Sequence, residues 1–142
     1  MAHKLIDKQV LYSGTRLSLE IHHLEDQITG RRTQREIVVH NGSVVILAFL
    51  DEKTILLIRN LRYAIGQQLL ELPAGTLDKG ESPMNAAGRE LQEETGYLPR
   101  RLRPLLHFFP SPGILSEKMY VFAAYDLKKT APALEEGEEI EL

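Results

Sequence analysis

The residues with the clearest capacity for chemistry are three glutamates, Glu90, Glu93 and Glu94, two thirds of the way along the chain. In a helix these positions lie about one turn apart, so the three side chains share a neighbouring face. Glu90 and Glu94 would repel each other by about 0.2–0.5 kcal/mol, and carboxylates near a helix C-terminus oppose the helix dipole. A hard divalent cation would remove both penalties. A solvated acidic face, with Arg89 offsetting Glu93, is the alternative.

The segment around these glutamates carries start and stop signals for a single helix. Ser82 can cap its N-terminus, and Pro83 suits the first helical position because that position needs no N–H donor. Gly96 can supply the left-handed residue that ends the helix, and Pro99 blocks its resumption. The apolar stripe expected to face the core is narrow and consists of Met84, Ala86, Ala87 and Leu91.

A longer pattern, GTLDKGESPMNAAGRELQEETGY at residues 75–97, decides between the two interpretations of the glutamates. Five residues separate Gly75 from Glu81, and seven more separate Glu81 from the run that begins at Arg89. This spacing resembles the box of the Nudix hydrolases, a family that cleaves nucleoside diphosphates linked to another group. Every fixed position matches. The last position is usually aliphatic and is Tyr97 here, which changes packing bulk and removes no ligand.

Segments outside the box resemble one branch of that family, the ADP-ribose pyrophosphatases, from about residue 35 to residue 124. Arg59 and Arg62 precede an ELPAG sequence at 71–75, and Pro112 follows Gly96 by sixteen residues. The acidic tail at 135–142 resembles a catalytic loop of the same branch. Taken singly, the arginines could be strand-end cations, the prolines a turn and the tail a solvated end. Their joint occurrence in the right order favours the branch.

The resemblance implies roles for the residues of the box. The implied ligands of a first metal ion are Glu90, Glu94 and the carbonyl oxygen of Ala74, and Glu93 is the implied ligand of a second ion. The ions expected are Mg²⁺ or Mn²⁺, and more than one of them. Arg89 and Glu81 would brace the loop that begins at Gly75 against the helix.

The resemblance also implies residues for catalysis and substrate binding. The general base is expected in the acidic tail, at Glu136 or Glu138, with Glu117 or Glu93 next in line. The expected substrate contacts are Arg35, Glu36, Arg59, Arg62, Pro112 and Gly113. The implied reaction is metal-dependent hydrolysis of ADP-ribose or a related nucleoside diphosphate sugar to AMP and ribose 5-phosphate. Alternatives are hydrolysis of another nucleotide sugar or diphosphate derivative, and a module that senses nucleotides without cleaving them.

The order of expected elements predicts one α/β domain over residues 1–142. Three strands at 4–13, 15–24 and 33–40 would form an N-terminal antiparallel unit of about residues 1–40. The catalytic core, about 41–142, would begin with a hairpin of strands 43–50 and 54–59, both buried on two faces. Strands at 68–72, 103–109 and 119–125 and a strand opening at Ile140 complete a mixed sheet. The resemblance implies an α/β/α sandwich, whose closing C-terminal helix is not found within these residues.

Composition limits the classes of partner. The 142 residues include no cysteine and carry a net charge of −3, and without the acidic tail 17 basic residues face 15 acidic ones. No basic footprint for nucleic acid and no long apolar segment for a membrane is present in the sequence. We therefore expect a cytoplasmic enzyme of a small nucleotide sugar, and the resemblance implies a homodimer.

Overall fold

The computed structural model describes residues 3–131, 133 and 140–141, and it divides into two compact units. The first unit comprises residues 1–42 and 109–118. The second comprises residues 43–108 and 119–142. Within the described part of the chain, no helix is long and apolar enough to cross a membrane.

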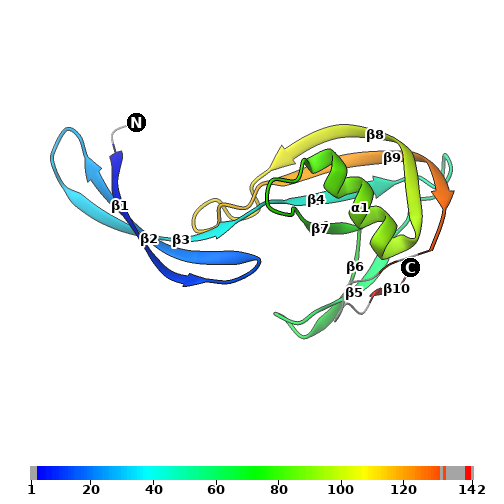
Figure 1. The fold of residues 1–142 in the computed structure, drawn as a ribbon, viewed down its shortest axis with the longest axis horizontal. Coiled ribbons are helices and arrows are strands. Elements are labelled where there is room, and N and C mark those ends of the chain that lie inside the picture. Colours follow the sequence, from blue (N-terminus) through cyan, green and yellow to red (C-terminus); the bar gives the residue numbers. More distant parts are fainter. Residues whose placement is uncertain (1–2, 132, 134–139, 142) are drawn as a thin grey trace. The chain divides into compact units, whose positions relative to one another are not determined.

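The first unit contains the predicted antiparallel sheet. Its strands are β1 (His3–Ser13), β2 (Leu17–Asp26) and β3 (Arg32–His40), in the order β1-β2-β3 (Figure 1). The turn between β2 and β3 is held by the Asp26 carboxylate, which accepts the backbone N–H groups of Ile28 and Thr29 at 2.8 and 2.9 Å. The 109–118 segment joins β3 through Val38, whose N–H donates to the Ile114 carbonyl at 2.8 Å. Within β1–β3 no side chain is fully buried.

The second unit holds two sheets and one described helix, α1 (Pro83–Thr95) (Figure 1). The larger sheet has the order β7-β4-β9-β8, with β7 at Ala74–Thr76, β4 at Ser43–Ala48, β9 at Met119–Lys129 and β8 at Tyr97–Phe108. The smaller has the order β10-β5-β6, with β10 at Ile140–Glu141, β5 at Ile58–Arg62 and β6 at Gln67–Glu71. Because β4 and β9 run parallel while the other pairs are antiparallel, the larger sheet is mixed.

The capping signals define α1 as predicted. The Ser82 side chain accepts the N–H of Asn85 at 3.3 Å, and Pro83 occupies the first turn. Gly96 has φ 71° and donates its N–H to the Gln92 carbonyl at 2.8 Å. Glycine suits this left-handed position because it has no Cβ to clash with the backbone.

The core of the second unit lies between α1 and the larger sheet. Alternate residues of β4 (Val44, Ile46 and Ala48) are fully buried, as are Ala86, Ala87 and Leu91 on α1. Burial of one large aliphatic side chain contributes about 1.5–3 kcal/mol, so this layer fixes α1 on the sheet. The predicted stripe is correct at these three helix positions and wrong at Met84, which stays 48% exposed.

The predicted hairpin of 43–50 and 54–59 is present only next to its turn. The Leu50 N–H donates to the Thr54 carbonyl at 2.9 Å, Phe49 forms an antiparallel bridge with Ile55, and the Leu56 N–H donates to the Ala48 carbonyl at 2.9 Å. The next strand begins at Ile58 and pairs with β6 and β10 in the other sheet. β4 instead pairs with β7 and β9, and its second face is only partly buried.

Candidate active site

Two carboxylates on α1 are buried against the short strand β7. Glu90 and Glu94 are 8% and 5% exposed, and Glu94 Oε2 accepts the backbone N–H of Ala74 at 2.9 Å. A Cβ placed on Gly75 would lie 1.9 Å from Glu90 Cδ. The Glu90 carboxylate therefore occupies space that only glycine leaves open, and the box glycine is explained by this contact.

Arg89 connects the loop before α1 to the helix itself. Its Nε and Nη2 donate to the two oxygens of Glu81, at 3.1 and 2.9 Å, and Nη2 also donates to the Thr76 carbonyl at 3.2 Å. Its Nη1 lies 2.8 Å from Glu93 Oε2 and 2.9 Å from Glu90 Oε1. One guanidinium thus contacts three carboxylates and one carbonyl oxygen. Lysine could not make the same contacts because it lacks the planar set of donors.

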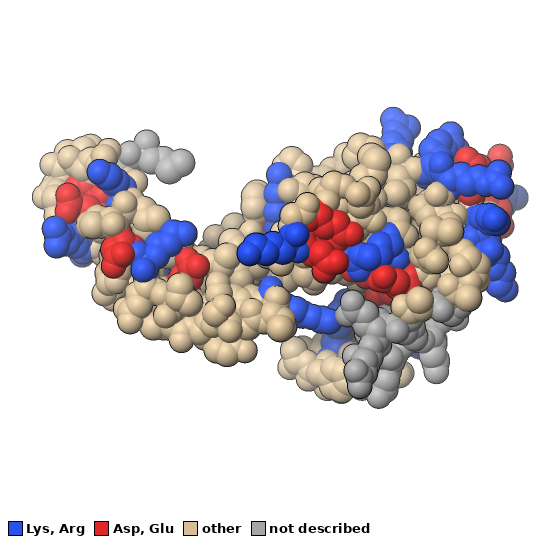
Figure 2. All heavy atoms as spheres, in the orientation of Figure 1, with Lys and Arg blue, Asp and Glu red and all other residues tan. Residues whose placement is uncertain are grey.

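The charges of this network reinforce one another. Hydrogen bonds from Arg89 hold the pKa of the Glu81 carboxyl below its usual value, and the Asp78 N–H, donated to Glu81 at 3.0 Å, acts in the same direction. The same hydrogen bonds to Glu81 raise the pKa of Arg89 further above its already high value. Figure 2 shows acidic and basic side chains alternating over the part of the surface that α1 occupies in Figure 1.

The donor set of the box fits a hard divalent cation. Among the described residues, no three acidic or histidine side chains converge as a complete protein cage. Mg²⁺ does not require one, because it is commonly held by one or two carboxylates together with water and substrate phosphates. Glu90 and Glu94 supply two buried carboxylates beside the Ala74 backbone. Glu93, the expected ligand of a second ion, is paired with Arg89.

The arginine pair predicted to bind substrate lies on the smaller sheet of the same unit. Arg62, at the end of β5, makes a two-pronged contact across the hairpin with Glu71 of β6, Nε to Oε1 at 2.9 Å and Nη2 to Oε2 at 2.5 Å. Arg59 lies on β5 with an exposed side chain. The Arg62 guanidinium is therefore oriented by Glu71.

Three other predicted substrate residues come together in the first unit. Arg35 and Glu36 of β3 and Gly113 of the 109–118 segment line one open pocket of about 420 Å³. Pro112 precedes Gly113 in the same segment and is exposed. The placement groups these residues, and their role in substrate binding stays a prediction.

Comparison with known proteins decides the family of this site. The model of the NUDIX domain matches residues 39–142. The chain belongs to the Nudix family. An ADP-ribose pyrophosphatase of Bacillus subtilis is 38% identical over 138 residues, which span 97% of this chain and 72% of that protein. A methanol dehydrogenase activator of Bacillus methanolicus is 36% identical over 98% of this chain and 76% of its own length.

The fold agrees with the family. A crystal structure described as an ADP compounds hydrolase superposes with a TM-score of 0.84 at 26% identity, covering 99% of this chain and 76% of that one. The mixed sheet with α1 packed on it is thus the α/β architecture of a Nudix hydrolase, and the resemblance of the box is confirmed at the level of family and enzyme class.

The remaining predicted residues are the candidates for the general base. Glu136 and Glu138, the candidate bases, lie outside the described residues. Glu117 belongs to the first unit, where its Oε1 lies 3.8 Å from His40 Nδ1. Glu93 faces Arg89.

Two features of the site were not singled out from sequence. The first is Glu71 as the partner of Arg62, which the hairpin register does not indicate, because Arg62 is paired with Gln67 and Glu71 with Ile58. The second is β7, three residues that place the Ala74 N–H against Glu94. No local pattern marks so short a strand.

Proposed function

We propose that this Nudix hydrolase cleaves the diphosphate bond of ADP-ribose or a closely related nucleoside diphosphate sugar, giving AMP and ribose 5-phosphate. The observation that carries the proposal is the pair of buried carboxylates, Glu90 and Glu94, held against the backbone of Ala74 and Gly75. The named activity of the Bacillus subtilis relative supports the choice of substrate. The ELPAG sequence and Pro112 support the same branch.

Divalent cations, Mg²⁺ or Mn²⁺ and more than one of them, would supply neutralisation of the diphosphate oxygens and a more acidic water. Glu90, Glu94 and the Ala74 carbonyl would hold the first ion. Glu93 would contribute to a second after its contact with Arg89 loosens. Arg89 itself acts as a positioning residue, because it ties Glu81 and the Thr76 carbonyl to the helix that carries the ligands.

The proton of the attacking water needs an acceptor that is not occupied by metal. Glu136 or Glu138 is the proposed base, and a positioned base contributes about 10²–10⁴ in rate. Point variants test this better than truncation, because removing residues 135–142 would also remove β10, whose Ile140 and Glu141 pair with Asn60 and Arg59 of β5. Glu136→Gln and Glu138→Gln are made singly and together. One single variant and the double variant should each lower kcat by that factor.

Substrate binding is assigned to the arginines of β5 and to the pocket of the first unit. Arg62, preoriented by Glu71, would hold a phosphate or the terminal ribose, and Arg59 would add a second cation. Arg35, Glu36, Pro112 and Gly113 would meet the adenine end. We further propose a homodimer, because β1 exposes large apolar side chains, among them Val10 at 57% and Tyr12 at 60%. A cytoplasmic location and one functional domain over 1–142 remain predictions.

A panel of nucleotides tests the substrate directly. ADP-ribose, other nucleoside diphosphate sugars, dinucleoside polyphosphates and nucleoside triphosphates are each incubated with the full chain and Mg²⁺, and products are separated by chromatography. We expect AMP and ribose 5-phosphate from ADP-ribose, and far slower formation of both from a Glu94→Gln control. Faster cleavage of another nucleotide sugar would replace ADP-ribose as substrate. Binding without cleavage would indicate a sensing module, which the retained box glutamates argue against.

A further inference from the structure

A second pocket of the first unit is built from residues of which only Arg35 has a role in the proposed hydrolysis. It lies where β1, β2 and the turn into β3 meet, and it has a volume of about 550 Å³. Its lining combines basic, hydroxyl and acidic side chains: His3, Asp26, Thr29, Arg31, Thr33 and Arg35.

The basic groups of this pocket outnumber the acidic one. Arg31 and Arg35 are permanently charged, and His3 adds a third nitrogen donor, against the single carboxylate of Asp26. That carboxylate is committed to the fold, because its Oδ1 accepts the N–H groups of Ile28 and Thr29 and its Oδ2 lies 3.8 Å from His3 Nε2. An anion entering the pocket would meet two guanidinium groups and one carboxylate already satisfied by backbone donors.

Thr33 gives an independent indication of a ligand. Its Oγ1 is buried, and it has no hydrogen-bond partner among the described residues, the one such side-chain atom found there. A buried hydroxyl without a partner is destabilising, so a partner supplied by a ligand would offset that penalty. Thr33 lines the pocket, and rotation about its χ1 exchanges methyl and hydroxyl between staggered positions.

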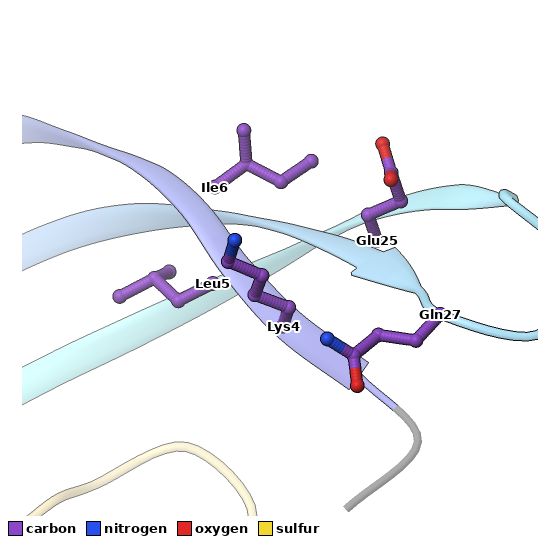
Figure 3. Close-up of a pocket in the computed structure, with 5 residues that line it drawn as sticks. All are labelled: Lys4, Leu5, Ile6, Glu25 and Gln27. Atoms are coloured by element: carbon purple, nitrogen blue, oxygen red, sulfur yellow. The ribbon is translucent and has the colours of Figure 1, made fainter.

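A neighbouring pocket on the same sheet shows the contrast. Figure 3 shows Lys4, Leu5 and Ile6 of β1 with Glu25 and Gln27 of the adjoining strand end and turn. Its basic and acidic groups balance, and two apolar side chains complete its lining. The pocket in Figure 3 offers no excess of donors, so it is not a comparable anion site.

We propose that the pocket lined by His3, Thr29, Arg31, Thr33 and Arg35 binds a phosphate-bearing anion at a site separate from the Nudix box. Phosphate matches the lining because its oxygens accept several charge-assisted hydrogen bonds at once from guanidinium forks and hydroxyl groups. The anion could be free phosphate or the phosphate of a mononucleotide, and both offer the same chemistry to these donors. The inference does not rest on the proposed hydrolysis, since none of its donors lies on α1 or β7 and only Arg35 is shared with the proposed substrate contacts.

Binding is measured by ¹⁵N amide chemical shifts of the full chain, titrated with inorganic phosphate and, separately, with AMP. The titrations are made without divalent cations and at constant ionic strength. We expect saturable shifts for the amides of residues 26–35 with both probes. Saturation by AMP but not by phosphate would identify a mononucleotide as the source, provided that Arg31→Gln weakens it and Arg32→Gln does not. Equal saturation would identify the phosphate group alone as sufficient.

Two variants and a matched control decide the donors. Arg31→Gln should weaken phosphate binding roughly tenfold, the value of one charge-assisted hydrogen bond. Arg32→Gln is the control, because Arg32 is the next residue but pairs with Glu25 at 3.1 Å and does not line the pocket. Arg35 is left intact because it is assigned to substrate binding.

Thr33→Val separates a ligand-binding hydroxyl from a merely structural one. Without phosphate, the variant should melt at a higher temperature, because it removes a buried hydroxyl that has no hydrogen-bond partner in the described part of the chain. With phosphate, the rise in melting temperature seen for the unmodified chain should shrink. The proposal is overturned if neither phosphate nor AMP shifts any amide of residues 26–35, or if Arg31→Gln and Arg32→Gln bind the probe equally well.

Discussion

The two units of the protein are stabilised in different ways. In the first, β1–β3 form a sheet of long strands in which no side chain is fully buried. In the second, short strands and one helix enclose a layer of fully buried aliphatic side chains. A sheet of three strands needs an apolar face covered by something to be independently stable. The second unit meets that requirement within itself, and the first does not within β1–β3.

The same contrast separates their charged groups. Acidic residues of the first unit, such as Asp26 and Glu20, have lowered pKa values because exposed backbone and side-chain donors satisfy them. The second unit buries Glu90 and Glu94 beside the backbone of β7. Burying two like charges one helical turn apart works against stability. The second unit therefore gives up stability at the box, and the first unit has no comparable buried pair among its described residues.

The largest expected effect is on turnover, from Glu94→Gln. Glutamine keeps an oxygen that can accept the Ala74 N–H but loses the charge that would bind a cation. We expect kcat to fall by about 10²–10³, equivalent to several kcal/mol of transition-state stabilisation. The metal-free melting temperature should stay equal or rise slightly because like-charge repulsion is relieved. Steady-state kinetics at saturating Mg²⁺ and a melting curve in chelator check both, and retention of most activity would remove Glu94 from the metal site.

Local signals in the sequence were sufficient for the helix and insufficient for the pairing of strands. Ser82 and Gly96 act within a few residues of themselves, so their prediction of α1 was confirmed. The turn after β4 was also local, but whether β4 pairs with the following segment depends on distant β9 and β7, which no short pattern encodes. Met84 fits the helical period yet stays exposed, because the sheet covers only part of that face.

The candidate site shows the same division. The box predicted the partners Arg89 and Glu81, which lie together in the structure. The helical spacing also indicated that Arg89 could offset Glu93, and the structure has this contact. No pattern indicated that Arg62 would meet Glu71, because that contact depends on side-chain rotamers across a hairpin. The clustering of Arg35 with Gly113 depends on the 109–118 segment joining β3, a contact distant in sequence.

The next prediction compares the loss of stability caused by a core substitution in the second unit with that caused by a surface substitution in the first. Ile46→Ala, in the core of the second unit, should lower the free energy of unfolding by about 2–5 kcal/mol, because Ile46 is fully buried. Val10→Ala, on β1, should lower it by less than about 1 kcal/mol, the span of strand propensity. Urea unfolding of both variants checks the difference. If Val10→Ala lowers the free energy of unfolding by more than this because a second copy covers Val10 in a dimer, the extra loss should disappear on dilution. A large loss that does not depend on protein concentration would contradict the contrast in burial.

A smaller effect concerns two glycines of the second unit. Gly75→Ala would bring a methyl group onto the Glu90 carboxylate, so we expect a loss of about 1–3 kcal/mol in unfolding free energy and reduced turnover. Gly88→Ala adds the same methyl within α1, where the nearest contact, Leu102 Cδ1 at 3.9 Å, is ordinary. This control should gain about 0.5–1 kcal/mol from helix propensity. Equal effects of the two variants on melting would show that the Glu90 contact is not restrictive.

The smallest expected effect compares one ion pair from each unit. Glu81→Gln removes a carboxylate that is 14% exposed and accepts two hydrogen bonds from Arg89. We expect the free energy of unfolding to fall by about 1–2 kcal/mol at neutral pH. Glu25→Gln breaks the pair with Arg32, whose side chains are 39% and 77% exposed, and should change stability by less than about 0.5 kcal/mol. The Arg89–Glu81 pair of the second unit should therefore contribute more to stability than the Arg32–Glu25 pair of the first, although each joins one arginine to one glutamate.

The pH dependence of that difference follows from the pKa of Glu81. Arg89 lowers this pKa in the folded protein below its usual value of 4.5, so folding favours the ionised carboxylate. The stabilisation is complete above pH 4.5 and is lost as the pH falls through the lowered folded pKa. The unmodified chain and Glu81→Gln should therefore differ in unfolding free energy at neutral pH and converge in acid. Urea unfolding across this range measures it, and a difference that stays constant in acid would show that Glu81 acts through packing and not through its charge.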